Sequence, residues 1–411
     1  MSAEVEHLLR AEAPQVLGAL VRRFGRFDVA EDAVQEALLA AHRAWPADGV
    51  PENPRSWLIR IGYRRMIDLL RSDQARHRRE VQAGAAELAL HEPARRASTP
   101  ETDDSLTVLL LCCHPALSST SQVALTLRAV GGLTTAEIAH AYGSTEATMA
   151  TRISRAKQQL AKAGARFTPP VDADREQRLA AVMQVLYLIF NEGYTASSGA
   201  ELTRVDLTAE AIRLTRMLCA AAPDDAEAAG LLALLLLTEA RRPARTGGDE
   251  TLVPWDEQDR SRWDGELIRE GTELLDRVWG RGAAGAYRIQ AAIAATHAAA
   301  AVPESTDWPQ IAALYLWLER LTPTGPVRLS RVVAVAKAYG PARGLALLND
   351  LNAHFHLDAE PLTRQREHAV RAHLLEMTGA RQEAAELYRR AAELTGNQAE
   401  QRYLLARAEQ L

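Results

Sequence analysis

The sequence predicts an all-α protein, and three observations support this prediction. Ala, Leu, Arg and Glu, which are good helix formers, dominate the composition, whereas aromatic residues make up only 5% of it. No stretch alternates apolar and polar residues in the way that is typical of a strand. The hydrophobic fraction of 47% over 411 residues is ordinary for a globular protein, so large helical cores can be buried.

Changes in composition divide the chain into four segments. Residues 1–72 have the pattern of a compact helical unit, and residues 73–104 form a polar, charge-rich stretch with Pro and Ser that we expect to be a linker. A second helical unit covers residues 105–166. After the boundary sequence TPPVDAD, residues 171–411 are helical in pattern and are interrupted by polar loops and Pro/Gly turns.

The first functional candidate is an amphipathic helix over residues 28–45. One side of this helix is apolar and suits a core. A second side follows the i, i+3, i+4, i+7 spacing of a helix face and forms the polar stripe, which consists of Asp32, Gln35, Glu36 and Leu39. A polar stripe that contains one leucine suits docking to another protein, although a lone exposed leucine is common on any surface.

A basic helix is predicted over residues 55–72, after a loop at 46–54 that three prolines hold stiff. One side of this helix forms the basic face, which consists of Trp57, Arg60, Arg64 and Arg71. Single-stranded DNA needs cations for its phosphates and a flat ring for a base, and the basic face offers both. In the alternative interpretation, Trp57 belongs to the core and the arginines only keep the surface solvated.

Residues 131–163 have the pattern of a helix–turn–helix. Thr134 and Glu137 form a capping box that starts the first helix. Gly143 is expected to end this helix with a tight turn, and Ser144 is expected to be the N-cap of the second helix. Two helices joined by a turn of this kind make up the helix–turn–helix motif.

The second helix of this motif has two distinct sides. Its apolar side carries Met149, Ile153, Ala156 and Leu160. The opposite side carries Thr148, Thr151, Arg155, Gln158 and Lys162, with Arg152 at its flank, and we call Thr148, Thr151, Arg152 and Arg155 the reading side. Threonine and arginine suit the major groove because they can reach base edges or phosphates. When the helix is taken alone, an ordinary amphipathic helix with a solvated outer side fits the pattern equally well.

The charge of the chain is unevenly distributed. The formal net charge is −5, yet residues 55–79 contain eight arginines against two acidic residues, and residues 151–166 contain five Lys or Arg and no acidic residue. Two basic stretches in an acidic chain can bind phosphate without making the whole protein adhere to nucleic acid. For each stretch alone, a solvated helix face is the simpler interpretation.

Three of these motifs, in this order, resemble regions two and four of the extracytoplasmic-function sigma factors. They are DVAEDAVQEALLAAHRAW, PRSWLIRIGYRRMIDLLR and TTAEIAHAYGSTEATMATRISRAKQQL, and the resemblance covers about residues 8–164. The remaining chain is similar to the long C-terminal extension of one subgroup, through segments such as YLIFNEGY and LVPWDEQDRSRWD. The resemblance implies a non-enzymatic protein that binds core RNA polymerase and directs the recognition and opening of promoter DNA in transcription initiation.

The resemblance also implies roles for the candidate residues. The polar stripe matches the helix that docks on the clamp helices of the largest polymerase subunit. The loop 46–54 and the basic face match the part that opens the minus-ten element and captures a flipped base. The reading side matches the helix that recognises the minus-thirty-five element. Gly62 and Tyr63 stand where many relatives carry an Asn or a further aromatic residue, which leaves the base-capturing residues open.

The C-terminal extension contains a candidate tetratricopeptide repeat at residues 367–397. Its small and aromatic positions are occupied in register by Gly379, Ala384, Tyr388 and Ala391, whereas Ala372 and Gly396 stand where Gly and Pro are usual. Stacked helix pairs of this kind form a concave surface that suits a partner. The extension is therefore expected either to bind a partner or to pack within the same chain against the DNA-binding segments.

Two other classes of function fit parts of the sequence. A repressor or activator with a ligand-sensing C-terminal domain would use the helix–turn–helix, but it would need neither the polar stripe nor the basic face. An enzyme or small-molecule site in residues 171–411 would draw on the carboxylates of WDEQDRSRWDGE (255–266). No nucleophile and base accompany these carboxylates, so a structured, salt-bridged loop is the favoured interpretation.

The sequence indicates no cofactor, metal site or membrane segment. Cys112, Cys113 and Cys219 suit buried small residues rather than disulfides or metal ligands, and no phosphate-binding glycine loop or histidine cluster is present. The N-terminus lacks a signal-peptide core, and the longest apolar run, at 228–237, is too short to span a bilayer. We therefore expect a soluble, cytoplasmic protein.

Overall fold

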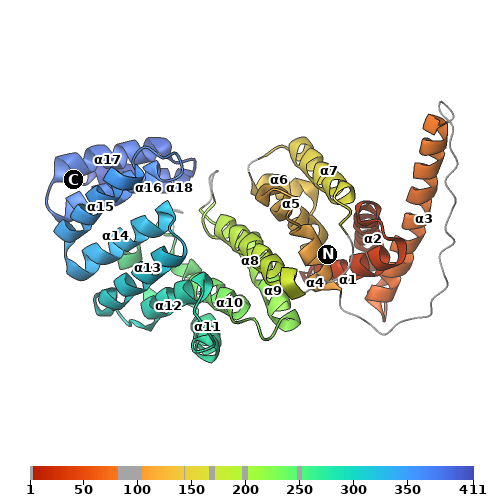
Figure 1. The fold of residues 1–411 in the computed structure, drawn as a ribbon, viewed down its shortest axis with the longest axis horizontal. Helices are drawn as coiled ribbons and strands as arrows, with labels where there is room; N and C mark the ends of the chain where they lie inside the picture. Colours follow the sequence, from red (N-terminus) through yellow and green to blue (C-terminus); the bar gives the residue numbers. More distant parts are fainter. Residues whose placement is uncertain (1–2, 82–103, 143, 166–171, 197–201, 248–251) are drawn as a thin grey trace. The chain divides into compact units, whose positions relative to one another are not determined.

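The structure, a computed structural model, describes residues 3–81, 104–142, 144–165, 172–196, 202–247 and 252–411. Within these ranges every regular element is a helix, and the one β-contact is an isolated bridge between Thr246 and Leu252. The predicted all-α class is therefore confirmed. The chain divides into two compact units, Met1–Leu188 and Ile189–Leu411 (Figure 1).

Three long helices begin the first unit: α1 (Ala3–Phe24), α2 (Phe27–Asp48) and α3 (Pro54–Val81). Each of them packs on the other two, and Leu17, Leu58 and Met66 are fully buried between them. α1 and α3 approach closely at Gly62, where a Cβ would lie only 2.9 Å from Cδ1 of Leu20. This small residue therefore lets the helix that carries the basic face pack tightly on the bundle.

The segment that we predicted to be a linker, residues 73–104, begins as helix. α3 continues through Val81, and Asp104 is the next residue that the structure describes. The remainder of the predicted linker, residues 82–103, lies outside the described residues.

Four shorter helices follow in the first unit: α4 (Ser105–Cys112), α5 (Ser119–Ala129), α6 (Thr135–Ala141) and α7 (Glu146–Lys162). The predicted capping box is present at the start of α6, where Thr134 and Glu137 exchange hydrogen bonds of 2.6 and 3.2 Å. The predicted N-cap Ser144 is wrong, because Thr145 accepts the hydrogen bond from Thr148 N at the start of α7. Gly143, predicted to end α6, lies outside the described residues.

α8 (Asp172–Tyr194) begins in the first unit and ends in the second. Arg178 of α8 donates a hydrogen bond of 2.7 Å to the carbonyl oxygen of Leu110 in α4. The first turns of α8 are thus tied to the first unit, although we assigned them to the extension from the sequence.

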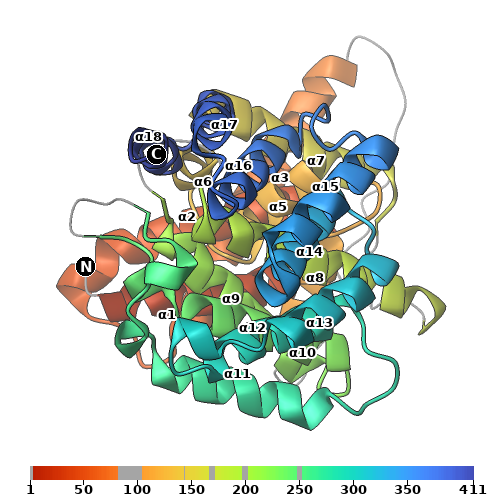
Figure 2. The ribbon, with the colours of Figure 1, turned by 90° about the vertical axis from the view of Figure 1, so that its left-hand side faces the viewer.

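The second unit is an array of helices that begins at the end of α8. Its α-helices are α9 (Val205–Ala221), α10 (Ala226–Glu239), α11 (Gly265–Val278), α12 (Ala286–Ala299), α13 (Trp308–Leu321), α14 (Gly325–Tyr339), α15 (Pro341–Phe355), α16 (Arg364–Met377), α17 (Arg381–Leu394) and α18 (Gln398–Glu409). Short 3-10 turns lie at Arg242–Ala244, Trp255–Glu257, Arg260–Arg262 and Pro303–Ser305. Helices that are near in sequence pack together, so the array follows chain order from α10 to α18 (Figure 2).

The array has several small cores. One joins α12 to α14 around Ile289 and Ile311, a second joins α14 to α16 around Val332 and Leu348, and a third joins α16 to α18 around Tyr388. A series of local cores means that each helix depends mainly on its neighbours in sequence, as in repeat proteins.

A buried arginine ties α10, α11 and α12 together. The Arg288 side chain is 3% exposed and donates from Nε to Oε1 of Glu227 at 2.6 Å. Its Nη1 donates to the carbonyl oxygens of Val278 and Arg281 at 3.0 and 2.7 Å. Gly230 makes room for this arrangement, because a Cβ there would lie 2.5 Å from Cγ of Arg288.

Candidate nucleic-acid interface

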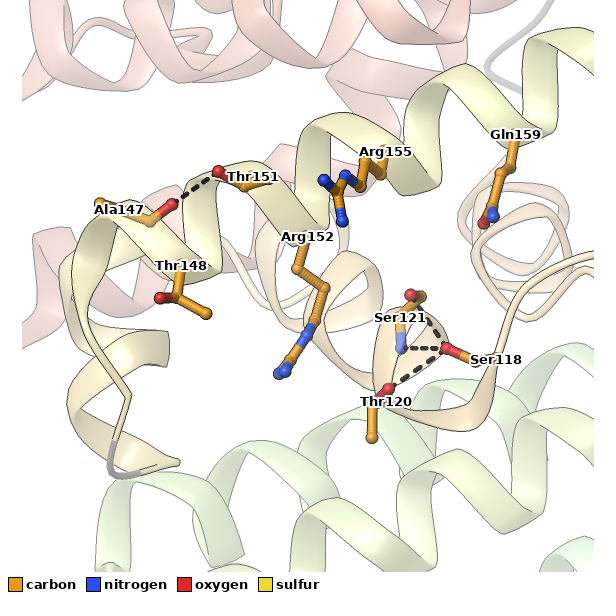
Figure 3. Close-up of a pocket in the computed structure, with 9 residues that line it drawn as sticks. All are labelled: Ser118, Thr120, Ser121, Ala147, Thr148, Thr151, Arg152, Arg155 and Gln159. Carbon is orange, nitrogen blue, oxygen red and sulfur yellow. Dashed lines mark hydrogen bonds between the residues drawn. The ribbon is translucent and has the colours of Figure 1, made fainter.

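The four residues of the reading side lie together in one open groove of the first unit (Figure 3). The groove is lined by Ser118, Thr120, Ser121, Ala147, Thr148, Thr151, Arg152, Arg155 and Gln159. The sequence predicted the lining residues from α7 except Ala147 and Gln159. It did not predict the three hydroxyl residues at the start of α5, which are Ser118, Thr120 and Ser121. Their Ser/Thr-rich sequence, SSTSQ, is a helix-start signal from which they could have been found.

The amphipathic pattern of α7 decides which side chains face this groove. The predicted apolar side, Met149, Ile153, Ala156 and Leu160, is buried against the rest of the unit. Thr148, Thr151 and Arg155 are exposed, and Arg152 is half-buried. Tertiary packing of the apolar side therefore turns the polar side outward, as a recognition helix requires.

The polar atoms in the groove can still bind a ligand. The Thr151 hydroxyl donates to the carbonyl oxygen of Ala147 at 2.9 Å, which leaves its oxygen free to accept. Neither Arg152 nor Arg155 forms an ion pair with a residue that the structure describes. Two guanidinium groups without a carboxylate partner offer both charge and a planar set of donors to phosphate or guanine.

The start of α5 forms the other wall of the groove. The Ser118 hydroxyl is the N-cap of α5, where it accepts from Ser121 N at 3.4 Å, and it also contacts the hydroxyls of Thr120 and Ser121. Hydroxyl groups and the amide groups of a helix start favour an anion, and contacts of this kind fix the register of a protein on the DNA backbone. The groove thus combines side chains that suit base contacts with groups that suit phosphate.

The basic face lies on α3, with its arginines in solvent. Arg60, Arg64 and Arg71 are exposed and make no ion pair with the described residues. Trp57 is half-buried, and its ring meets that of the buried Trp45 edge-on at 5.6 Å between centroids. Trp57 is therefore partly a packing residue, as the alternative interpretation expected, and the arginines are the open part of the basic face.

Other aromatic and basic residues of α3 are held by the bundle. Tyr63 packs against Phe24 at 5.2 Å between ring centroids, and Arg23 lies over its ring at 5.6 Å. Arg55 pairs with Glu12 at 2.6 Å, and Arg65 pairs with Glu36. The basic stretch predicted from the sequence is thus smaller in the structure, since two of its arginines already have carboxylate partners.

The polar stripe on α2 is only partly open. Leu39 is 50% exposed, whereas Gln35 is buried and donates from Nε2 to the carbonyl oxygen of Arg128 at 3.0 Å. Asp32 accepts from Nζ of Lys157 at 2.7 Å. Lys157, one of the five Lys or Arg counted in the basic stretch 151–166, is therefore already paired with a carboxylate.

A buried carboxylate that the sequence analysis missed lies beside this stripe. Glu31 is 1% exposed, and its two oxygens accept from Arg128 Nε at 2.8 Å and from Lys157 Nζ at 2.9 Å. Burial by itself would raise the pKa of Glu31, but Lys157 and Arg128 hold that pKa below its ordinary value. Glu31 and Asp32 in turn hold the pKa of Lys157 above its ordinary value despite its burial.

The carboxylates of residues 255–266 do not gather into a site. Asp256 pairs with Lys337 at 2.5 Å, and Asp264 caps α11 by accepting from Leu267 N at 3.1 Å. Among the described residues, no group of three or more His, Cys, Asp or Glu side chains is placed to hold a metal ion. Nothing in this arrangement favours the enzyme interpretation.

The loop around these carboxylates is structured and salt-bridged, as the sequence predicted: Asp256 pairs with Lys337, and Glu257 lies 3.9 Å from Arg407. The Arg241 guanidinium lies 3.1 Å from the centroid of Trp255, and that of Arg260 lies 4.8 Å from the centroid of Trp263. Burial, together with Arg241 and Arg260, lowers the pKa of nearby His297 to about 3, so this imidazole is neutral at physiological pH. Cation–π packing adds to these ion pairs in stabilising the loop.

Two of the three cysteines are buried as expected, whereas Cys219 is half-buried. Cys112 and Cys113 are buried free thiols, and burial raises the pKa of Cys113 to about 12. Burial also raises the pKa of Cys219 to about 11. Thiols of this kind stay protonated at neutral pH and are poor nucleophiles.

An exposed reading helix in a helix–turn–helix, together with a second helix that presents unpaired arginines, defines a class of DNA-binding protein. Comparison with known families agrees with this class. The model described as Sigma-70 region 2 matches residues 8–76, and the model described as Sigma-70, region 4 matches residues 107–160. A family of unknown function, DUF6596, matches residues 178–279.

Individual relatives extend this comparison. An uncharacterized protein of Rhizobium meliloti is 40% identical over 411 residues, covering 97% of this chain and 94% of its own. The ECF RNA polymerase sigma factor SigK of Mycobacterium ulcerans is 29% identical over 147 residues, covering 36% of this chain and 78% of its own. SigK of Mycobacterium tuberculosis (strain H37Rv) is 27% identical over 157 residues, with the same two coverages of 36% and 78%. No solved structure matches the chain significantly.

The chain belongs to the extracytoplasmic-function sigma factors of the sigma-70 family and carries a long helical extension at its C-terminus. The family resemblance stated from the sequence is confirmed. Sigma factors are non-enzymatic factors of transcription initiation, and a match to region 2 does not favour the repressor or activator alternative. None of the helices in the described part of the chain combines the length and apolar character that a membrane crossing requires.

Proposed function

We propose that this sigma factor recognises the upstream promoter element with α7, opens the minus-ten element with α3 and docks on core RNA polymerase with α2. The observation that carries the proposal is the groove in Figure 3, where the whole reading side lies beside the hydroxyl-rich start of α5. One surface thereby combines candidate base contacts and candidate phosphate contacts, and specific DNA recognition needs both.

The proposal for promoter opening is supported by the exposed arginines of α3. Arg60, Arg64 and Arg71 can hold the phosphates of a separated strand, while the accessible part of Trp57 offers a ring to an unstacked base. Unpairing costs a few kcal/mol, and phosphate and stacking contacts offset this cost.

The docking proposal is supported by the exposed Leu39 beside the acidic residues of α2. The half-exposed leucine gives an apolar contact, and Glu36 and Asp32 give the surrounding polar rim. Because core polymerase is the proposed partner, we also propose that the protein acts in the cytoplasm.

Run-off transcription tests the proposed function as a whole. Core polymerase with this protein alone should yield specific transcripts from a cognate promoter, and core polymerase without it should yield none. The promoters are selected by the binding of the protein to genomic DNA in the presence of core enzyme. If the folded protein yields no transcript from any of them, the proposal is contradicted.

Replacing Arg155 by alanine tests the upstream contact. Arg155 is exposed on the reading side, so we expect binding to the cognate upstream element to weaken by roughly 1–3 kcal/mol if its guanidinium reads a base. Fluorescence anisotropy with cognate and scrambled duplexes measures the effect, and Arg269→Ala, which removes an exposed arginine of the second unit, is the control. An equal loss on both duplexes would reduce Arg155 to a phosphate contact, and no loss would refute its role.

We also propose that the extension is tetratricopeptide-like and modulates activity through contacts with the sigma regions or with polymerase. The helix pair α16 and α17 supports the first part, because Ala384, Tyr388 and Ala391 are buried and Gly379 has the positive φ of 84° that a tight turn favours. Charge supports the proposed modulation of activity. Residues 167–411 contain 27 Lys or Arg and 34 Asp or Glu, whereas residues 1–166 contain 21 Lys or Arg and 19 Asp or Glu. An acidic extension can mask a basic DNA-binding surface, or it can brace the two DNA-binding regions.

Two truncations distinguish masking from bracing. One chain ends after Ala165, and the other ends after Leu188, so that Arg178 keeps its hydrogen bond to α4. If both truncated proteins give more run-off transcript than the full-length protein, the extension masks the DNA-binding surface. If they give less transcript while their melting temperature is preserved, the extension braces the two DNA-binding regions. Unchanged activity across salt concentrations would show that the extension does not regulate initiation.

A further inference from the structure

Three helices of the extension each contribute one polar side chain to the α14–α18 cluster, which consists of Lys337, His373 and Arg407. These residues follow one another at intervals of about 35 positions, close to the 34-residue length of a tetratricopeptide repeat. α14 and α16 share one core, and α16 and α18 share another, so the three helices are neighbours in the array. Stacked helices that repeat a polar residue at this spacing form a binding surface in repeat proteins.

Two adjacent carboxylates of the chain itself occupy this cluster. Asp256 Oδ2 lies 2.5 Å from Nζ of Lys337, and Glu257 Oε1 lies 3.9 Å from Nη1 of Arg407. His373 lies close to both pairs, because burial and then Lys337 lower its pKa while Asp256 acts in the opposite direction. The 3-10 turn that carries the carboxylates comes 81 positions before Lys337, so this contact is a long-range one.

The turn is anchored by residues other than these carboxylates. The Arg241 guanidinium lies 3.1 Å from the centroid of Trp255, and the His297 ring packs on the same tryptophan at 4.1 Å between centroids. Gln258 is 6% exposed, accepts from Arg241 at 3.2 Å and donates to the carbonyl oxygen of Val253 at 3.1 Å. The backbone of the turn can therefore stay in place when the two carboxylates leave their partners.

The ion pairs of the turn are weak enough to be exchanged. The Asp256 and Glu257 side chains are 49% and 61% exposed, so water screens their pairs and each contributes little to stability. The cations are better enclosed, since Lys337 and Arg407 are 19% and 25% exposed. Arg407 also pairs with Glu376, yet its buried Nε has no hydrogen-bond partner in the described part of the chain. The cluster thus retains two cations and an unused donor for another acidic group.

We propose that the α14–α18 cluster binds an acidic peptide segment of a partner protein, and that Asp256 and Glu257 compete with this partner for the same cations. The turn shows which chemistry fits, namely two adjacent carboxylates with one on each cation. A segment with several carboxylates replaces both ion pairs at once, and its further contacts offset the loss of the turn. The inference goes beyond the promoter contacts proposed above and does not depend on them.

Fluorescence anisotropy with a labelled peptide tests the cluster in the full-length protein. The acidic probe is a blocked peptide that copies residues 253–257 and continues with four more acidic residues; the neutral probe has Asn and Gln in place of Asp and Glu. The double variant Asp256→Asn, Glu257→Gln should bind the acidic probe about tenfold more tightly than the wild type, if the turn occupies the cluster in about nine of ten molecules. Adding Lys337→Met should abolish this gain, whereas adding Arg269→Met, which removes an exposed arginine of the same unit, should not.

Zero-length carbodiimide crosslinking tests the competition in the wild-type protein. This reagent joins an amine to a carboxylate in contact with it, so the free protein should yield a crosslink between Lys337 and Asp256. The acidic probe should suppress this crosslink and become joined to Lys337 itself, whereas the neutral probe should leave the crosslink unchanged.

Three outcomes would overturn the inference. The first is a crosslink that persists at probe concentrations that saturate the double variant. The second is a double variant with normal thermal melting that binds the acidic probe no more tightly than the wild type. The third is an equal gain in affinity for a single-stranded oligonucleotide, which would show that the cluster does not select a peptide.

Discussion

Replacing Arg288 by methionine is expected to lower the free energy of unfolding of the second unit by about 3–5 kcal/mol. Methionine keeps the apolar stem that packs against Gly230 but removes every donor of the guanidinium group. Glu227, 23% exposed, then loses its cation, and the carbonyl oxygens of Val278 and Arg281 lose a donor in a buried position. A buried polar group that loses its hydrogen-bond partner destabilises the fold by more than the intact hydrogen bond stabilised it.

Thermal melting of the full-length protein, followed by tryptophan fluorescence, measures this loss. For a unit of this size, 3–5 kcal/mol corresponds to a decrease in Tm of roughly 6–20 °C. Arg269→Met is the matched control, because Arg269 and its partner Glu273 are 65% and 60% exposed and such pairs contribute about 0.5 kcal/mol or less. A decrease for Arg288→Met no larger than that for Arg269→Met would show that the buried cluster is not a major support of the fold.

Features that depend on neighbouring residues could be predicted from the sequence. The buried side of α7, from Met149 to Leu160, follows from helical periodicity alone, and so does the capping box at Thr134. The N-cap of α7 was misplaced by one residue because Ser144 and Thr145 both cap helices well, and only the path of the chain decides between them.

Features that depend on long-range contacts could not be predicted in this way. Glu31 looked like one more charge on an acidic helix, yet its partners Arg128 and Lys157 lie 97 and 126 positions further along the chain. Periodicity assigns a residue to a side of its own helix but says nothing of which other helix meets that side. For the same reason the count of basic residues in 151–166 could not show that Lys157 is paired.

The loop at residues 255–266 illustrates a second limit. Its mixed charges predicted a salt-bridged loop but not the partner of each charge. In the structure, Arg260 lies over Trp263 and donates to carbonyl oxygens, while Asp256 pairs with Lys337. Charge alternation predicts that a loop is solvated or paired, but the choice of partner depends on which aromatic rings and backbone groups are buried nearby.

Replacing both Arg60 and Arg64 by alanine is expected to impair promoter opening by roughly 30- to 150-fold while leaving the binding of core polymerase intact. Both side chains are exposed on α3 and carry no carboxylate partner among the described residues, so their charges are available to the phosphates of a separated strand. Each contact of this kind contributes about 1–1.5 kcal/mol, and two of them account for the expected factor. Because α2 is untouched, the proposed docking surface should be unchanged.

Permanganate footprinting of minus-ten thymines measures the opening, and a titration with salt tests its cause. Loss of two phosphate contacts to a single strand should flatten the dependence of log K on log salt by about 1.4. Arg65→Ala is the matched control, because this neighbouring arginine already pairs with Glu36 and lies outside the basic face. Normal thymine reactivity in the double variant would contradict the role of α3 in melting. Equal impairment by Arg65→Ala would instead show that charge anywhere on α3 suffices, and that Arg60 and Arg64 have no specific position on the strand.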